Sequence, residues 1–145
     1  MNPDNVIDVT RLIQLAVAPV FLLTAVGTII GVLSNRLGRA VDRSRTLEDR
    51  LRQLQPEGQR AVREELNLLS RRVRLVYGSI VLSVLCALFV GLLIAVAFVD
   101  AFIDLDLSKF IGLLFIAAML AFILALMVFL REIFLAVSSA RSQMR

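Results

Sequence analysis

Apolar and polar residues are grouped in long blocks along this chain, and the blocks predict helices. Three apolar runs, residues 12–33, 76–99 and 110–130, contain no charged side chain. Each is long enough for a helix that crosses a bilayer, which needs about 20 residues. We therefore expect three transmembrane helices. Because residues 133–137 are again apolar, we expect the third helix to continue into a cytoplasmic C-terminal helix.

The stretch between the first two runs, residues 34–75, has a different pattern. Apolar or small residues recur at alternating steps of four and three on both sides of a turn signal, Pro56 and Gly58. This spacing keeps a narrow apolar seam on one side of each helix, where a partner helix can pack. Proline cannot continue a helix interior, so the chain is expected to turn at Pro56. No proline separates the first apolar run from the first arm, so we expect one long helix there. The predicted antiparallel coiled-coil hairpin has a seam of Leu33, Leu37, Ala40, Ser44, Leu47, Leu51 and Leu54, then Val62, Leu66, Leu69, Val73 and Val76.

The placement of charge predicts an orientation. Residues 36–74 hold eleven arginines and six acidic residues, whereas the linker over residues 100–109 holds three aspartates and one lysine. Positively charged loops stay on the cytoplasmic side, so we expect a cytoplasmic hairpin and C-terminus and a periplasmic N-terminus and linker. The predicted fold is an all-α membrane protein with three transmembrane helices and a cytoplasmic hairpin between the first and second. It forms a single domain over residues 1–145.

Polar side chains lie on one broad side of the first helix at about 100° per residue. One interpretation is a packing face that hydrogen-bonds to neighbouring helices. The other is a wet stripe that lines a pore in an oligomer. The candidate residues for this face are Gln14, Thr24, Thr28 and Asn35.

Small residues four positions apart let another helix backbone approach closely. Gly27 and Gly31 form one such pair in the first helix. A longer ladder in the second helix consists of Ser79, Ser83, Ala87 and Gly91. Three helices can cover one ladder internally and leave the other for a neighbour, so we expect a homo-oligomer.

Charged residues gather where the apolar runs meet the hairpin. Arg36, Arg39, Arg131 and Glu132 lie at similar depth if the three spans have equal length. Glu132 then pairs with Arg36 or Arg39, because unpaired charge at that depth is costly. Alternatively, Arg131 reaches to the surface and Glu132 is solvated. Three basic residues lie near the start of the second span. They hold the hairpin on the cytoplasmic side, bind anionic lipid headgroups, or do both. These residues are Arg71, Arg72 and Arg74.

Composition argues against catalysis and nucleic-acid binding. The chain is 59% hydrophobic with a mean hydropathy of +0.84, and it has no histidine and one cysteine, Cys86. Zinc sites and Ser-His-Asp or Cys-His chemistry are therefore not expected, and no glycine-rich phosphate loop is present. No aromatic residues interleave with the arginines, as they would at a nucleic-acid surface. We expect no catalytic, cofactor or metal site.

Several segments of the chain resemble a known family. Residues 12–27, 34–43, 72–77 and 129–136 are similar to a bacterial family of small inner-membrane proteins catalogued as domain of unknown function 2721. The resemblance implies a stand-alone domain in a bacterial inner membrane and brings no known activity. The family pattern gives first rank among candidate sites to Pro19, Asn35, Arg36, Asp42, Arg43, Arg131 and Glu132.

Two functions follow from these expectations. The first is a non-enzymatic, oligomeric structural or interaction module whose hairpin pairs with copies of itself or with a cytoplasmic protein. The second is a homo-oligomeric channel for ions or small solutes, lined by the polar face of the first helix. Both involve anionic lipids at the cytoplasmic face and exclude nucleic acid as a partner.

Overall fold

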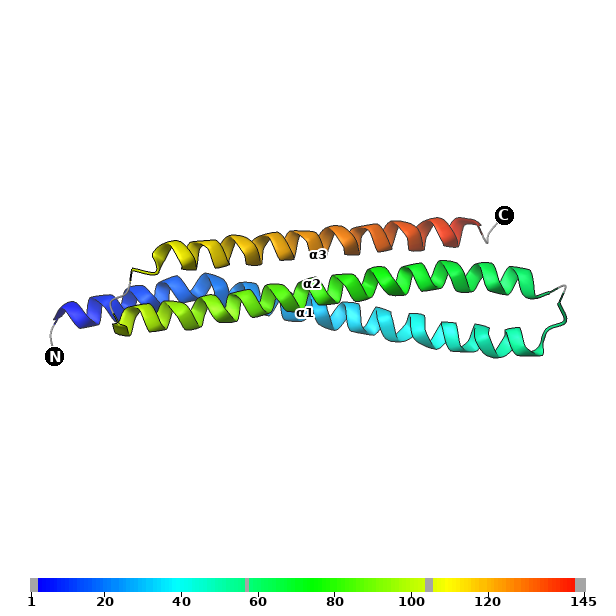
Figure 1. Cartoon of the computed structure of the whole chain (residues 1–145), viewed down its shortest axis with the longest axis horizontal. Helices are drawn as coiled ribbons and strands as arrows, with labels where there is room; N and C mark the ends of the chain where they lie inside the picture. The colour runs from blue at the N-terminus through cyan, green and yellow to red at the C-terminus, as the bar shows by residue number, and fades with distance from the viewer. Residues whose placement is uncertain (1–2, 57, 104–105, 143–145) are drawn as a thin grey trace. The chain divides into compact units, whose positions relative to one another are not determined.

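The computed structural model describes residues 3–56, 58–103 and 106–142, with side chains described for residues 14, 17–56, 58–103 and 106–137. The chain forms three helices, α1 (Pro3–Gln53), α2 (Gln59–Ile103) and α3 (Ser108–Ser142) (Figure 1). All three are long and apolar enough to cross a membrane. The expectation of an all-helical chain with three helices of spanning length is therefore confirmed, and the first span and first arm form one continuous helix.

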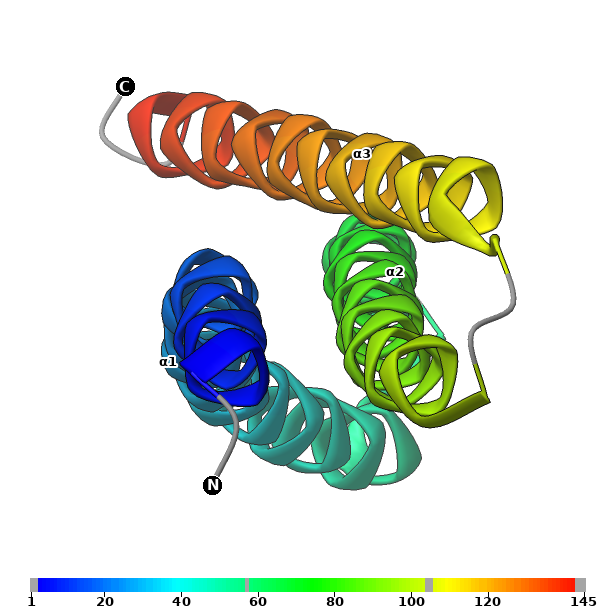
Figure 2. The same cartoon turned by 90° about the vertical axis from the view of Figure 1, so that its left-hand side faces the viewer.

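Contacts divide the chain into two compact units. The first contains Met1–Ile30 and Leu82–Ile123, and the second contains Gly31–Val81 and Leu124–Arg145. Each unit takes one section from each of the three helices. In the first unit the three sections surround a common apolar core (Figure 2). Its fully or nearly fully buried members are Val26, Cys86, Val90, Ala118 and Ala121.

The second unit contains the two arms of the hairpin, which run antiparallel along α1 and α2 (Figure 1). The turn lies where Pro56 and Gly58 predict it, since α1 ends at Gln53 and α2 begins at Gln59. The Gly58 amide donates to the Gln55 carbonyl at 3.0 Å, and the Gln59 side-chain amide donates to the Leu54 carbonyl at 3.0 Å. Both bonds lie in the turn itself, and the Gln59 side-chain amide also donates at 3.4 Å to the Leu51 carbonyl, one of those that the end of α1 leaves without a helical partner.

Burial in the second unit follows the spacing expected of the seam. Leu33, Leu47, Leu69 and Val76 are buried, and the intervening seam residues are half-buried. Leu54 is the exception, with 41% of its surface exposed. Its expected place in the seam is wrong because α1 has already ended, so the residue lies in the turn.

The linker between the second and third spans is shorter than residues 100–109. Helix α2 continues to Ile103 and α3 begins at Ser108. The Asp100 carboxylate explains part of this difference, because its Oδ1 accepts the Leu107 amide at 3.1 Å and so caps the start of α3 from within α2. Helix α3 continues beyond residue 130 and runs to Ser142.

Candidate functional site

One buried carboxylate joins all three helices of the second unit. Glu132 of α3 is 1% exposed. Its Oε1 accepts hydrogen bonds from Nε and Nη2 of Arg72 in α2, at 3.3 and 3.1 Å. Its Oε2 lies 3.5 Å from Nη1 of Arg36 in α1. We refer to these three residues as the Glu132 cluster.

Helix periodicity places the members of the cluster on the buried faces of their helices in the second unit. Arg36 lies three residues after buried Leu33, and Arg72 lies four residues before buried Val76. Glu132 lies seven residues after buried Ala125. Residues separated by three, four or seven positions share one face of a helix. Each charged side chain therefore projects from the inward face of its own helix.

An aromatic ring holds one of the arginines in place. The Arg36 guanidinium lies over the Phe129 ring, 5.5 Å from its centroid. Phe129 precedes Glu132 by three residues on α3, so the ring and the carboxylate receive Arg36 from the same helix face. Cation–π contact of this kind adds about 0.5–1 kcal/mol when the cation is partly exposed.

The charge balance of the cluster is uneven. A buried carboxylate is stable only when it is paired and hydrogen-bonded. Here two guanidinium groups face one carboxylate, and the Arg36 and Arg72 side chains keep 26% and 29% of their surface exposed. Both arginine side chains are therefore partly in contact with solvent, whereas the carboxylate between them is not.

A second ion pair links the two arms farther along the hairpin. Arg43 donates from Nη2 and Nε to Oε1 of Glu65, at 2.7 and 3.2 Å. Both side chains are substantially exposed, so this pair contributes at most about 1 kcal/mol.

The structure brings together some of the predicted charged residues and separates others. The expected pair of Glu132 with Arg36 is present, and the alternative of a solvated Glu132 is wrong because its carboxylate is buried. Arg39 and Arg131 are exposed. Among the residues expected to meet lipid headgroups, Arg71 and Arg74 are exposed, whereas Arg72 donates to Glu132.

The expected polar face lies on the outside of the chain. Gln14, Thr24, Thr28 and Asn35 are all exposed. The Thr24 hydroxyl donates to the Val20 carbonyl at 3.2 Å, and the Thr28 hydroxyl donates to the Thr24 carbonyl at 3.0 Å. Both threonines therefore satisfy their donors within α1.

The small-residue ladder of α2 divides into buried and exposed parts. Ser79 and Ser83 are fully buried, Ala87 is half-buried and Gly91 is exposed. A Cβ atom added at Gly91, Gly27 or Gly31 would have nothing within 4 Å. The glycines are therefore open positions on the described chain, whereas the serines belong to its interior.

The described residues contain no group of three or more His, Cys, Asp or Glu side chains that could hold a metal ion. Cys86 is buried in the apolar core of the first unit. The Glu132 cluster itself joins the three helices of the second unit by electrostatic contacts.

A comparison with protein families gives one decisive match. The model of the family described as "Protein of unknown function (DUF2721)" matches residues 16–142. The chain belongs to this family. No curated protein and no solved structure matches it.

The match includes every member of the Glu132 cluster but not Gln14. Sequence reasoning missed Arg72 as a partner of Glu132, although one signal was available. Arg72 lies four residues before Val76 of the seam and three after Leu69, which places it beside the seam, where a facing carboxylate can be reached.

Proposed function

We propose that this DUF2721 protein is a non-enzymatic module of a bacterial inner membrane that holds a two-helix, coiled-coil arm in the cytoplasm. Glu132 is the observation that carries this proposal. Its carboxylate contacts one arginine from each arm of the hairpin, 3.1 Å from Arg72 and 3.5 Å from Arg36. A hairpin attached to a spanning helix in this way has a fixed base and presents its tip to a partner.

The arginine distribution supports the orientation. Residues 36–74 carry eleven arginines, and a loop this basic is retained in the cytoplasm. The N-terminus and the α2–α3 connection then face the periplasm, and the C-terminus lies in the cytoplasm. Arg71, Arg74 and Arg131 are exposed near the ends of the spans, where anionic headgroups contribute about 1 kcal/mol per basic residue.

We propose further that copies of the chain associate through α1. Gly27 and Gly31 are exposed and leave open space beside the backbone. Apposed glycines allow close helix packing in a membrane, where van der Waals contact drives association. The hairpin then pairs with other copies or with a cytoplasmic protein.

The test is disulfide crosslinking in native membranes. The buried Cys86 is first replaced by alanine, and one cysteine is then introduced at Gly31 or, as a control, at Phe21. Phe21 is also on α1 and is 71% exposed. Rapid crosslinking at Gly31 with little at Phe21 supports the proposed contact. Equal crosslinking at both positions, or none at either over several expression levels, refutes it.

A channel is the second candidate, and the exposure of the polar face favours it. Gln14 and Asn35 are amide side chains that lie exposed on a helix long enough to span a membrane. In an oligomer these residues can face a shared axis. Ion flux into vesicles that falls at least tenfold in Asn35→Leu supports the channel, whereas flux equal to that of protein-free vesicles removes it.

A further inference from the structure

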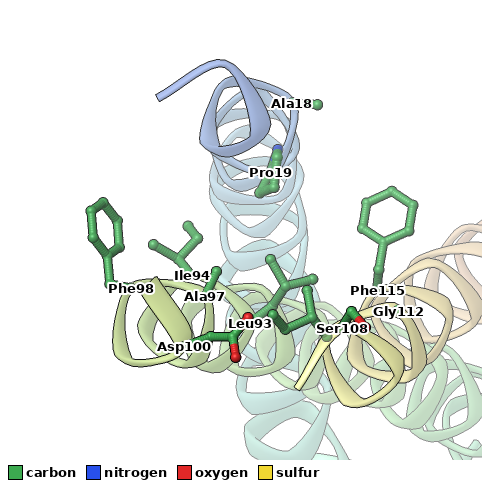
Figure 3. Close-up of a pocket in the computed structure, with 11 residues that line it drawn as sticks. Ala18, Pro19, Leu93, Ile94, Ala97, Phe98, Asp100, Ser108, Gly112 and Phe115 are labelled. Atoms are coloured by element: carbon green, nitrogen blue, oxygen red, sulfur yellow. The ribbon is translucent and has the colours of Figure 1, made fainter. Parts of the chain in front are cut away.

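The first unit contains an apolar pocket of about 510 Å³ at the end where α2 meets α3. Phe98 of α2 and Phe115 of α3 flank the space on opposite sides, and Pro19 faces it from α1 (Figure 3). The volume lies within the range of pockets that bind small molecules, roughly 300–1,000 Å³.

Small side chains create this volume. Ala18, Ala97 and Gly112 line the pocket, one from each helix. A Cβ atom at Gly112 would meet nothing within 4 Å. The helices therefore approach each other without filling the space between them.

The polar end of the pocket presents hydrogen-bond acceptors. Asp100 and Ser108 line it there. Asp100 Oδ1 accepts the Leu107 amide, and the Ser108 hydroxyl donates to Asp106 Oδ1 at 2.6 Å. With its hydrogen committed to Asp106, the Ser108 oxygen offers only lone pairs to a ligand. Asp100 offers negative charge.

The apolar wall continues from this end along α2. Leu93 lies seven residues before Asp100, which corresponds to about 10 Å at the rise of an α-helix. In a membrane-spanning helix, Asp100 lies at the end of the apolar run, at the depth of the headgroups, and Leu93 lies deeper. A ligand that fits has an elongated apolar body and a head that donates hydrogen bonds.

We propose that this pocket binds a protonated amine carried on an apolar chain. The ammonium group pairs with Asp100 and donates to Ser108, and the chain lies between Phe98 and Phe115. An anionic head is repelled by Asp100, and a neutral alcohol brings a single donor and no charge. Either a membrane lipid with an amine headgroup or a free amphiphilic amine supplies this chemistry.

The test uses tryptophan fluorescence, because the chain has no tryptophan of its own. The full-length Phe115→Trp variant is reconstituted in phosphatidylcholine vesicles. Alkylamine, alkanol and alkanoate of equal chain length, each brominated in the chain, are added as quenchers. Phe134→Trp reports partition into the bilayer alone, since Phe134 is 67% exposed and belongs to the second unit. We expect the amine to quench the Phe115→Trp variant at a concentration about tenfold lower than the alkanol, after correction by Phe134→Trp.

Two further variants separate binding from folding. Asp100→Asn keeps an oxygen that accepts the Leu107 amide, so α3 begins normally, and it should abolish the preference for the amine. Gly112→Leu should fill the pocket and weaken quenching by the alkylamine, the alkanol and the alkanoate alike. Gly38→Leu is its matched control, because it also adds a side chain in open space but lies outside the pocket.

Brominated phosphatidylethanolamine and brominated phosphatidylcholine, compared as guest lipids, identify the source. Stronger quenching of the Phe115→Trp variant by phosphatidylethanolamine assigns the site to a membrane lipid. Quenching by the alkylamine alone assigns it to a free amphiphile. Equal quenching by amine and alkanol, a preference for the alkanoate, or an amine preference that persists in Asp100→Asn overturns the proposal.

Discussion

Replacing Glu132 by glutamine removes one negative charge from the Glu132 cluster and preserves its shape. Glutamine still accepts from Arg72, but two charge-assisted hydrogen bonds become weaker bonds to a neutral acceptor, at a loss of about 1 kcal/mol each. The attraction of Arg36 is lost as well. Water can reach the 26–29% exposed arginines and offsets part of the cost. We therefore expect a loss of about 2 kcal/mol in the free energy that holds the hairpin base closed, which is about 30-fold in the opening equilibrium.

Thiol labelling under native conditions measures this opening. The reporter is a cysteine at Leu69, which is 8% exposed and lies three residues before Arg72, in a chain whose Cys86 is replaced by alanine. When closing is faster than labelling, the rate of maleimide modification follows the population of the open form. The Glu132→Gln variant should label about 30 times faster than its parent.

The exposed acid Glu64, on the same arm as the reporter, provides the matched control. Glu64→Gln removes the same charge from a solvated position, and its labelling rate should stay within about twofold of the parent, as for most surface substitutions. A rise of less than threefold in Glu132→Gln, or equal rises in both variants, would refute the argument that the buried carboxylate holds the arms.

Three further predictions follow from the same structure. Cysteines placed at Gln53 and Ala101 should react with an impermeant label from opposite sides of the membrane, and reaction of both from one side would contradict the three-span topology. Leu47→Asp should loosen the hairpin by about 2–5 kcal/mol, because Leu47 is 1% exposed, whereas Arg50→Gln at an exposed position should leave protease resistance unchanged. Gly31→Leu should reduce crosslinking between copies that carry their single cysteine at Gly27, without lowering helix content, since the added side chain meets only open space within one chain.

The helices were predictable because their signals are local and redundant. The three apolar runs predict three helices of membrane-spanning length. Pro56 predicts the end of the first arm, because proline disrupts a helix interior in any surroundings. The alternating steps of the hairpin correctly indicate that Leu33, Leu47, Leu69 and Val76 face inward. The existence of each helix thus follows from the composition of its segment and the spacing of its apolar residues alone.

The ladder in α2 shows where such reasoning fails. A step of four residues advances about 400° around a helix, so each rung drifts by about 40°. From Ser79 to Gly91 the drift totals about 120°, which takes the ladder from the buried face to the exposed one. Residues spaced alternately by three and four, such as Ser83, Cys86, Val90 and Leu93, remain buried instead.

The Glu132 cluster was half predictable. If the three spans have equal length, Arg36 and Glu132 lie at the same depth, and this alone indicates that they can meet. Rotation of α2 about its own axis decides whether Arg72 faces outward or toward the interior. The charge pattern around residues 71–74 does not specify that rotation, and the signal that does is the spacing of Arg72 from Leu69 and Val76 of the seam. In the structure Arg72 turns toward Glu132, whereas its neighbour Arg71 is exposed.

The pocket beside Asp100 was not predictable, because an unfilled volume depends on which small residues face one another. Ala18, Ala97 and Gly112 come from three different helices, and nothing in their local sequence links them. Asp100 was expected in a linker. Its role as a cap became visible only with the position of the Leu107 amide.

A double-mutant cycle between Arg72 and Glu132 tests most directly whether α3 holds the hairpin. The labelling rate of the Leu69 reporter is measured in Arg72→Gln, Glu132→Gln and the double variant. Direct contact at 3.1 Å predicts a coupling energy of about 1–2 kcal/mol, so the double variant should open about 5- to 30-fold less than the product of the two single effects. Arg43→Gln, whose partner is Glu65, should show no coupling to Glu132. Additive effects of Arg72→Gln and Glu132→Gln, within about 0.3 kcal/mol, would contradict the claim that their contact joins the hairpin to α3.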